Sequence, residues 1–149
     1  MSRIPSMFLL IVAAAFLGCS SGQPTLIPGR NPTIPVRGQI TLDGTPIEGA
    51  TVMFFCEKLM ITSYGKTDKA GQYELTTYEP GDGAPAGRYQ VSVKKIEQTI
   101  VQPSDHPAIP PKSKTVQHLP PQYSDYKSSE LKAVVAEGGN NAFQFNLSK

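Results

Sequence analysis

The chain is poor in cysteine, histidine and charge. Its 149 residues include two cysteines and two histidines, and charged residues make up 17%. So few cysteines exclude a disulfide-stapled scaffold, and a domain of this length buries enough apolar surface to fold without one. Two histidines fall short of the three protein ligands that a catalytic zinc ion needs. A carboxylate such as Asp105 or Asp125 could supply the third ligand, but no spacing enforces it. We therefore expect no metal and no cofactor.

Basic clusters are also missing. The 14 lysines and arginines are scattered, the formal net charge is +2, and Lys94-Lys95 is the single adjacent pair. A nucleic-acid-binding domain usually gathers such residues into a stripe or patch, often with aromatic residues between them. The sequence therefore predicts no nucleic-acid partner.

Glycine and proline, in contrast, are abundant. The 13 glycines and 14 prolines disfavour a helical bundle, because both residues are unfavourable inside helices. They suit short strands joined by many turns. A length of 149 residues corresponds to one domain.

Residues 1–18 have the features of an export signal. Arg3 gives a positive start, and Met7 to Leu17 form an apolar run that is too short to span a membrane. Gly18-Cys19 follows, and the sequence here resembles a bacterial lipoprotein signal peptide, although Phe16 stands where that family usually has leucine. The resemblance implies cleavage before Cys19 and lipidation of that cysteine. An ordinary secretory signal that ends near a cysteine is the alternative.

The following residues, 19–34, form a tether. Pro24, Pro28 and Pro32 lie there with two glycines and few apolar groups. A flexible chain of about 14 residues reaches roughly 20 Å. We expect an exported protein held by an acyl anchor at Cys19 on the periplasmic or outer face of the cell envelope, and the sequence leaves open which membrane carries it.

From residue 35 onward the hydrophobic pattern has a period of two, which is typical of half-buried strands. Seven strands are predicted, at 36–42, 50–57, 60–66, 72–78, 87–94, 131–136 and 142–147. Asp43-Gly44 favours a hairpin turn, and the last two strands are expected to form a C-terminal hairpin. Cys56 ends an apolar run and is expected to be a buried, inert thiol. Seven short strands with regular turns indicate a single antiparallel seven-stranded β-sandwich over residues 35–149.

Several motifs of these strands resemble a known family. Val36-Arg37-Gly38-Gln39-Ile40, the segment from Asp43 to Val52, Thr67-Asp68-Lys69-Ala70-Gly71-Gln72-Tyr73 and Gly87-Arg88-Tyr89-Gln90-Val91 resemble the carboxypeptidase regulatory-like domains of the transthyretin-like (prealbumin-like) group. Leu119 to Tyr123, Ser129 to Leu131 and Gly138 to Leu147 resemble one branch of small bacterial lipoproteins. These are turn and core motifs, so the resemblance implies a fold and says little about function.

The segment 96–130 is predicted to be a long proline-rich loop. Its candidate partner contacts are Tyr123, Tyr126, His106 and His118. The tyrosines could cap one end of the sandwich or present an aromatic contact surface. We favour packing for Tyr123 and leave Tyr126 open.

No catalytic centre is recognisable, and we expect the protein not to be an enzyme. Ser104-Asp105-His106 contains the residue types of a hydrolase triad, but three consecutive residues rarely converge as a triad must. Some transthyretin-like proteins are hydroxyisourate hydrolases, with a histidine in the first strand and a Tyr-Arg-Gly-Ser ending, and this chain has neither. We expect a non-catalytic interaction or structural module with an envelope protein or glycan as partner. The alternative is a carrier of a small ligand, glycan or metal that uses the loop 96–130.

Overall fold

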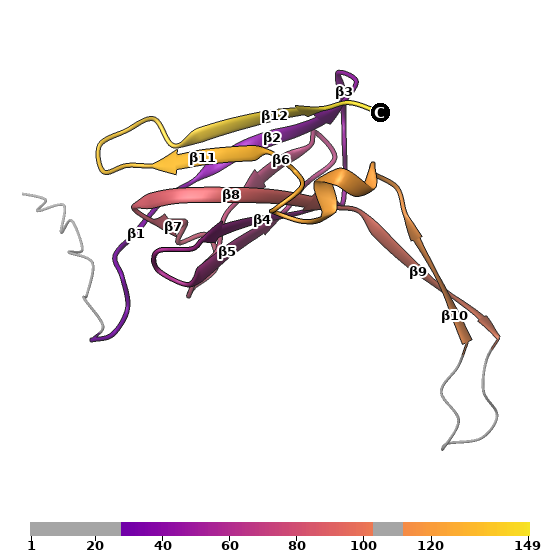
Figure 1. Ribbon diagram of the computed structural model, residues 1–149, viewed down its shortest axis with the longest axis horizontal. Helices are drawn as coiled ribbons and strands as arrows, with labels where there is room; N and C mark the ends of the chain where they lie inside the picture. Colours follow the sequence, from indigo (N-terminus) through magenta and orange to yellow (C-terminus); the bar gives the residue numbers. More distant parts are fainter. Residues whose placement is uncertain (1–27, 103–111) are drawn as a thin grey trace, which may run out of the picture.

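The computed structural model describes residues 28–102 and 112–149, which form an all-β protein with mostly antiparallel sheets (Figure 1). The predicted signal peptide, Cys19 and His106 lie outside these residues. Within the described part of the chain, no helix is long and apolar enough to cross a membrane. A strand is present at each of the seven predicted positions.

One large sheet is antiparallel, with the strand order β11-β8-β4-β5. Its strands are β4 (Thr51–Cys56), β5 (Ile61–Lys66), β8 (Gly87–Lys94) and β11 (Leu131–Val135). Alternate residues of β4 are buried, because successive side chains point to opposite faces of a strand. In β8, Tyr89, Val91 and Val93 face inward, as the sequence predicts.

The second large sheet has the order β12-β2-β3, and β6 also pairs with β2. Its strands are β2 (Arg37–Leu42), β3 (Thr45–Pro46), β6 (Gln72–Glu74) and β12 (Ala142–Leu147). Asp43 and Gly44 connect β2 to β3 with positive φ angles of 49° and 80°, which is the two-residue hairpin turn that Asp-Gly predicts. β6 is shorter than its predicted strand.

The two sheets enclose one hydrophobic core, and Phe54 of β4 lies at its centre. Its ring is fully buried, with its centroid 5.8–6.2 Å from the rings of four residues. These are Tyr73, Tyr89, Phe143 and Phe145. Tyr73, Phe143 and Phe145 belong to the opposite sheet, so this aromatic cluster joins the two layers. Tilted aromatic pairs add about 0.5–1.5 kcal/mol each beyond the burial of their area.

The predicted C-terminal hairpin is wrong. β11 pairs with β8 in one sheet, whereas β12 pairs with β2 in the other, and that second pairing is parallel. The fold is therefore not antiparallel throughout. The connection 136–141 passes from one sheet to the other, and the Asn141 side chain stabilises it by bonding both the amide and the carbonyl of Ala136. The crossing lets the apolar face of β12 pack against Phe54 from the opposite side of the core.

The segment 96–130 is not one long loop. It contains β9 (Ile96–Gln102), β10 (Lys112–Gln117) and the 3-10 turn η1 (Pro121–Ser124). β9 and β10 pair in antiparallel fashion and project from one end of the molecule as a two-stranded ribbon (Figure 1). We call residues 96–102 and 112–117 the arm, and the part built around the two large sheets the body.

The described N-terminal residues join the body at the other end. β1 (Thr33–Ile34) pairs with β7 (Ala84–Pro85), so the chain that leads from the N-terminus is fixed beside the start of β8. Arg30 strengthens this attachment, because its guanidinium lies 3.2 Å from the Glu79 carboxylate and 5.0 Å from the centre of the Tyr78 ring. Figure 1 shows β1 and the arm at opposite ends of the body.

Candidate functional site

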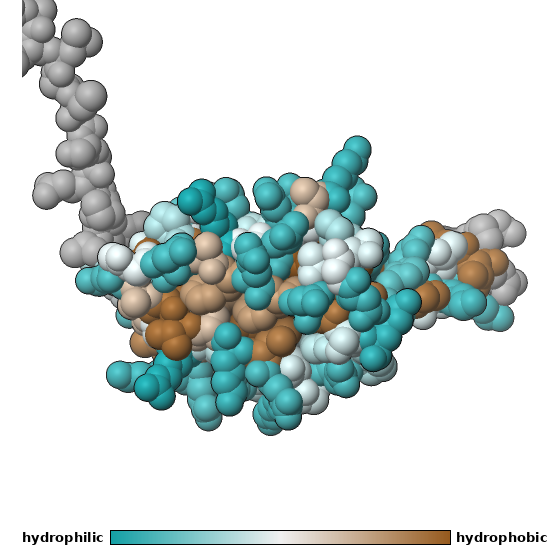
Figure 2. Space-filling model, turned by 90° about the horizontal axis from the view of Figure 1, so that it is seen from above, coloured by the Kyte–Doolittle hydropathy of each residue, from teal (hydrophilic) through white to brown (hydrophobic). Residues whose placement is uncertain are grey.

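The arm stands out as a candidate contact site because large apolar side chains are exposed on it. Ile96, Ile100 and Val101 are 57–61% exposed, and Val116 is 38% exposed. Seen from above, brown apolar residues lie along the arm between hydrophilic ones (Figure 2). Most exposed hydrophobic residues on a protein are scattered singly, whereas contiguous patches mark contact sites. The four side chains do not share one face, but their concentration on one short ribbon makes the arm a candidate contact surface.

The two faces of the ribbon differ in charge. One face carries Ile96 and Ile100, and its other described side chains are uncharged, namely Gln98, Ser113, Thr115 and Gln117. The opposite face carries Glu97, Thr99, Lys114 and Val116, whereas Val101 is an extra residue of β9 without a partner on β10. Gln98 donates a hydrogen bond to Ser113 across the uncharged face, at 2.8 Å. This side-chain hydrogen bond links β9 to β10 in addition to their backbone pairing.

The base of the arm is closed by polar contacts. The His118 amide donates to the Lys95 carbonyl at 2.9 Å, and the His118 ring lies 2.9 Å from the Glu97 carboxylate. The Lys95 amide in turn donates to the Gln117 side chain. His118 is thus exposed, and its contacts with Lys95 and Glu97 hold the two strands together at the base of the arm. No group of three or more histidine, cysteine and carboxylate side chains arranged to hold a metal occurs in the described residues.

The two candidate tyrosines lie on the body, and the structure does not join them with His118 into one surface. Tyr123 is buried, and its hydroxyl accepts a hydrogen bond from the Ser148 amide at 3.1 Å. Hydrogen bonds from the Ser148 side chain and backbone lower the pKa of Tyr123 below its usual value. Tyr126 is half-buried, and its ring centre lies 4.8 Å from that of Phe55. Tyr123 is thus part of the packed core cluster, and Tyr126 covers Phe55 on the outer face of β4.

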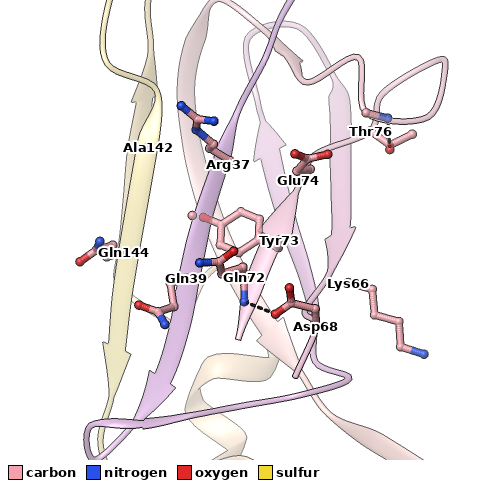
Figure 3. Close-up of a pocket in the computed structure, with 12 residues that line it drawn as sticks. Arg37, Gln39, Lys66, Asp68, Gln72, Tyr73, Glu74, Thr76, Ala142 and Gln144 are labelled. Carbon is pink, nitrogen blue, oxygen red and sulfur yellow. Dashed lines mark hydrogen bonds between the residues drawn. The ribbon is translucent and has the colours of Figure 1, made fainter. Parts of the chain in front are cut away.

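The hollows on the described part of the body include a polar one and an apolar one. The first is polar and lies on the outer face of the second sheet, where Figure 3 shows Arg37 and Gln39 of β2, Gln72 and Glu74 of β6 and Gln144 of β12. Its charges are mixed, and an internal hydrogen bond from the Gln72 amide to Asp68 lies at its edge. No exposed aromatic ring lines it, so it offers sugars no stacking platform.

The second hollow is apolar and has a volume of about 800 Å³. Phe55, Leu59 and Val134 line it, and positive charge predominates because Lys58, Arg88 and Lys132 outnumber Glu57. It lies on the outer face of the β4-β8-β11 sheet, and Cys56 borders it as a buried thiol that forms no disulfide among the described residues.

Sequence reasoning did not find the exposed aliphatic residues of the arm. The signal was present in the β-branched run Thr99-Ile100-Val101 and in Thr115-Val116, since such residues favour strands. The prolines that surround these short runs led instead to the prediction of a loop.

Comparisons with known proteins do not assign the chain to a family. No protein-family model matches it, and no curated protein matches it in sequence. A solved structure, the 9R-lipoxygenase from Cyanothece PCC8801, aligns with a TM-score of 0.35 and 15% identity, covering 79% of this chain and 16% of that one. The chain thus spans a small part of the lipoxygenase, and a similarity at this level supports neither a shared fold nor a shared activity.

Proposed function

We propose that the protein is a non-catalytic, membrane-anchored lipoprotein of the cell envelope whose domain presents the arm to an envelope protein. The observation that carries the proposal is the position of the arm at the opposite end of the body from β1, where the tether attaches (Figure 1). An acyl anchor at Cys19 would hold the β1 end toward the membrane. The arm would then point away from it, where a partner can reach its exposed aliphatic side chains.

The fold proposed for the body is the seven-stranded sandwich of carboxypeptidase regulatory-like, transthyretin-like domains. The Asp43-Gly44 turn, the Asp68 turn and the strand beginning at Gly87 support it, because they are the motifs that carry the resemblance. Asp68 accepts hydrogen bonds from the amides of Ala70 and Gln72, both at 2.8 Å. Motifs of this kind stabilise turns and a core, which agrees with a structural role and suggests no chemistry.

The anchor is tested by mass and by fractionation. Intact-mass measurement of the mature chain is expected to show a species that begins at Cys19 and carries acyl chains, and this species should sediment with membranes. Cys19→Ser is expected to release the chain from the membrane fraction. A mature chain that begins at Cys19 without added acyl mass, or a Cys19→Ser chain that stays membrane-bound, would contradict the anchor.

The role of the arm is tested by its removal. Because the His118 amide bonds the Lys95 carbonyl, replacing residues 96–117 by Asn-Gly closes the base with a two-residue hairpin turn. The full chain with a C-terminal tag after Lys149 is expected to capture an envelope protein from cells after cross-linking, and the chain without the arm is expected to lose it. The matched control exchanges Met60, an exposed residue of the body, for serine. Undiminished capture without the arm would refute the proposed role.

A second candidate function is favoured by the apolar hollow. Its volume of about 800 Å³ suits a small ligand, and the basic residues Arg88 and Lys132 suit an apolar molecule with an acidic group. A medium-chain fatty acid is then expected to raise the melting temperature of the full chain, and the Arg88→Gln and Lys132→Gln double variant should abolish the rise. Lys112→Gln with Lys114→Gln on the arm is the control. No shift in the unsubstituted chain would eliminate this carrier function.

A further inference from the structure

The outer edge of β9 is an unprotected strand edge from Ile96 to Ile100, before the extra residue Val101 interrupts the regular pairing. Its sequence, Ile96-Glu97-Gln98-Thr99-Ile100-Val101-Gln102, contains no proline, glycine or lysine, and its described side chains are exposed. Natural proteins usually block such an edge with charge, proline or a bulge, because its free N–H and C=O groups invite pairing with another strand. The one charged residue, Glu97, is drawn to the β10 side by His118 at 2.9 Å.

The outer edge of β10 differs. Lys112 and Lys114 lie along it, both exposed, whereas the one irregularity in the described pairing of the ribbon is the extra residue Val101, which belongs to β9. Edge lysines are one of the devices that prevent further strand addition. The arm therefore has one edge open to pairing and one edge that resists it.

A two-stranded ribbon without further support is only marginally stable in water, and three or more strands are needed for independent stability. The arm projects from the body and is paired within itself alone, as far as the described residues extend (Figure 1). A strand added along β9 would supply the missing stabilisation.

We propose that the arm pairs with the arm of a second copy of this chain, β9 against β9 in antiparallel fashion, to form a four-stranded sheet between two copies. This inference rests on the proposed role of the arm as contact element, and it names the first partner of that element. The lysine-bearing β10 strands form the outer edges, so the assembly closes at two copies, as a twofold interface does.

The backbone fixes a suitable register. The bond from the His118 amide to the Lys95 carbonyl marks this pair as hydrogen-bonded, so Glu97 and Thr99 direct their backbone groups toward β10. Ile96, Gln98 and Ile100 then direct theirs toward the open edge, and this regular alternation ends at the extra residue Val101. Pairing centred on Thr99 places Gln98 opposite Ile100 of the second copy and Ile100 opposite its Gln98, which allows about four backbone hydrogen bonds.

The side chains suit this register. Thr99 lies opposite Thr99 of the second copy, and Glu97 lies opposite Val101, so no two like charges face each other across the twofold axis. The uncharged faces of the two arms become continuous, and the two Ile100 side chains become diagonal neighbours within reach of each other. The two bodies are attached at opposite ends of the new sheet.

The test is disulfide trapping in cells that express the full chain. Because Thr99 is a non-hydrogen-bonded pair at the centre, its two Cα atoms lie about 4.5 Å apart, which a disulfide can bridge. Thr99→Cys is expected to give a reducible dimer on mild oxidation, whereas Thr115→Cys, the matched threonine on β10, is expected to stay monomeric. The unsubstituted chain controls for Cys19 and Cys56.

A Thr99→Cys chain that stays monomeric, or equal trapping at both positions, would overturn the pairing. Size measurement of the detergent-solubilised chain gives a second reading, in which Ile100→Lys should convert the dimer to monomer and the cross-strand control Ser113→Lys should not. Membrane fractionation of the same cells separates the two proposals. An anchored monomer refutes the pairing alone, and a dimer in the non-membrane fraction refutes the anchor alone.

Discussion

The Tyr73 hydroxyl donates a hydrogen bond to the backbone carbonyl oxygen of Phe143 at 3.0 Å and crosses Gly38 to reach it. Gly38 pairs with Tyr73 on one side and with Phe143 on the other, so the three residues lie side by side on β6, β2 and β12. A side chain at position 38 would overlap the Phe143 carbonyl and the Tyr73 hydroxyl. The glycine thus makes room for a bond that ties together three strands of the second sheet. Burial of Tyr73 also raises the pKa of its phenol far above the usual value.

The first prediction concerns this glycine. Gly38→Ala is expected to cost more than about 4 kcal/mol, because a backbone clash cannot relax cheaply. Tyr73→Phe is expected to cost about 1–3 kcal/mol through the loss of one buried hydrogen bond. Denaturant unfolding measures both, with Gly139→Ala as the control in a roomier place. A Gly38→Ala variant as stable as the control would contradict this account of the sheet.

The second prediction contrasts two neighbouring phenylalanines. Phe54→Ala is expected to lower the free energy of unfolding by about 3–5 kcal/mol, since it empties the centre of the aromatic cluster. Phe55→Ala should cost about 1–2 kcal/mol, because its ring is half-buried and loses mainly its contact with Tyr126. Chemical denaturation of the two variants checks the difference. Equal losses would mean that Phe54 is not the centre of the core.

The third prediction concerns pH. Tyr89 is buried, and its hydroxyl donates to the Pro85 carbonyl at 2.8 Å. Burial, with a smaller contribution from nearby Cys56, raises the pKa of Tyr89 to about 12. A folded-state pKa above the unfolded value of about 10 means full stability below pH 10 and a loss as pH rises from there through the folded value. Tyr89→Phe should reduce this loss, which Tyr73 then still causes in part because its pKa is also raised, whereas exposed Tyr64→Phe should leave the profile unchanged.

The fourth prediction is that the body folds without the arm. Replacing residues 96–117 by Asn-Gly leaves the core cluster untouched, because the described arm residues contribute no member to it. The midpoint of chemical denaturation is expected to stay close to that of the full chain, while the hydrogen-exchange protection of β8 and β11 remains. A chain that fails to fold after this replacement would show that the arm is part of the folding unit.

Sequence reasoning could locate the strands of the body because each has one buried face. Alternation in Tyr89-Gln90-Val91-Ser92-Val93 and in Phe143-Gln144-Phe145 gives both the strand and the direction of its side chains. It could not assign β12 to a sheet, because the same alternation fits a hairpin with β11 and a parallel pairing with β2. Which of the two pairings forms depends on the path of the connection 136–141. It also depends on the packing of Phe54, which β12 covers from the second sheet.

The arm was missed for the opposite physical reason. Both of its faces are exposed, so Ile96 to Val101 show no separation of buried and exposed positions, and the neighbouring prolines favour a loop. Whether Tyr123 and Tyr126 can contact a partner also depends on how they pack in the folded chain. Tyr126 is half-buried because its ring packs against Phe55, which points outward from the central strand β4. Sequence alone does not show that these two rings are close in space.

The most direct test of the central claim is site-specific photo-cross-linking in cells. A photoreactive residue is placed at Ile100 on the arm or at Met60 on the body, two apolar positions that are 61% and 76% exposed. If the arm is the contact element of an anchored envelope module, Ile100 should cross-link to a defined protein, a second copy included, and Met60 should not. Cross-links that occur at Met60 and are absent at Ile100 would contradict the account.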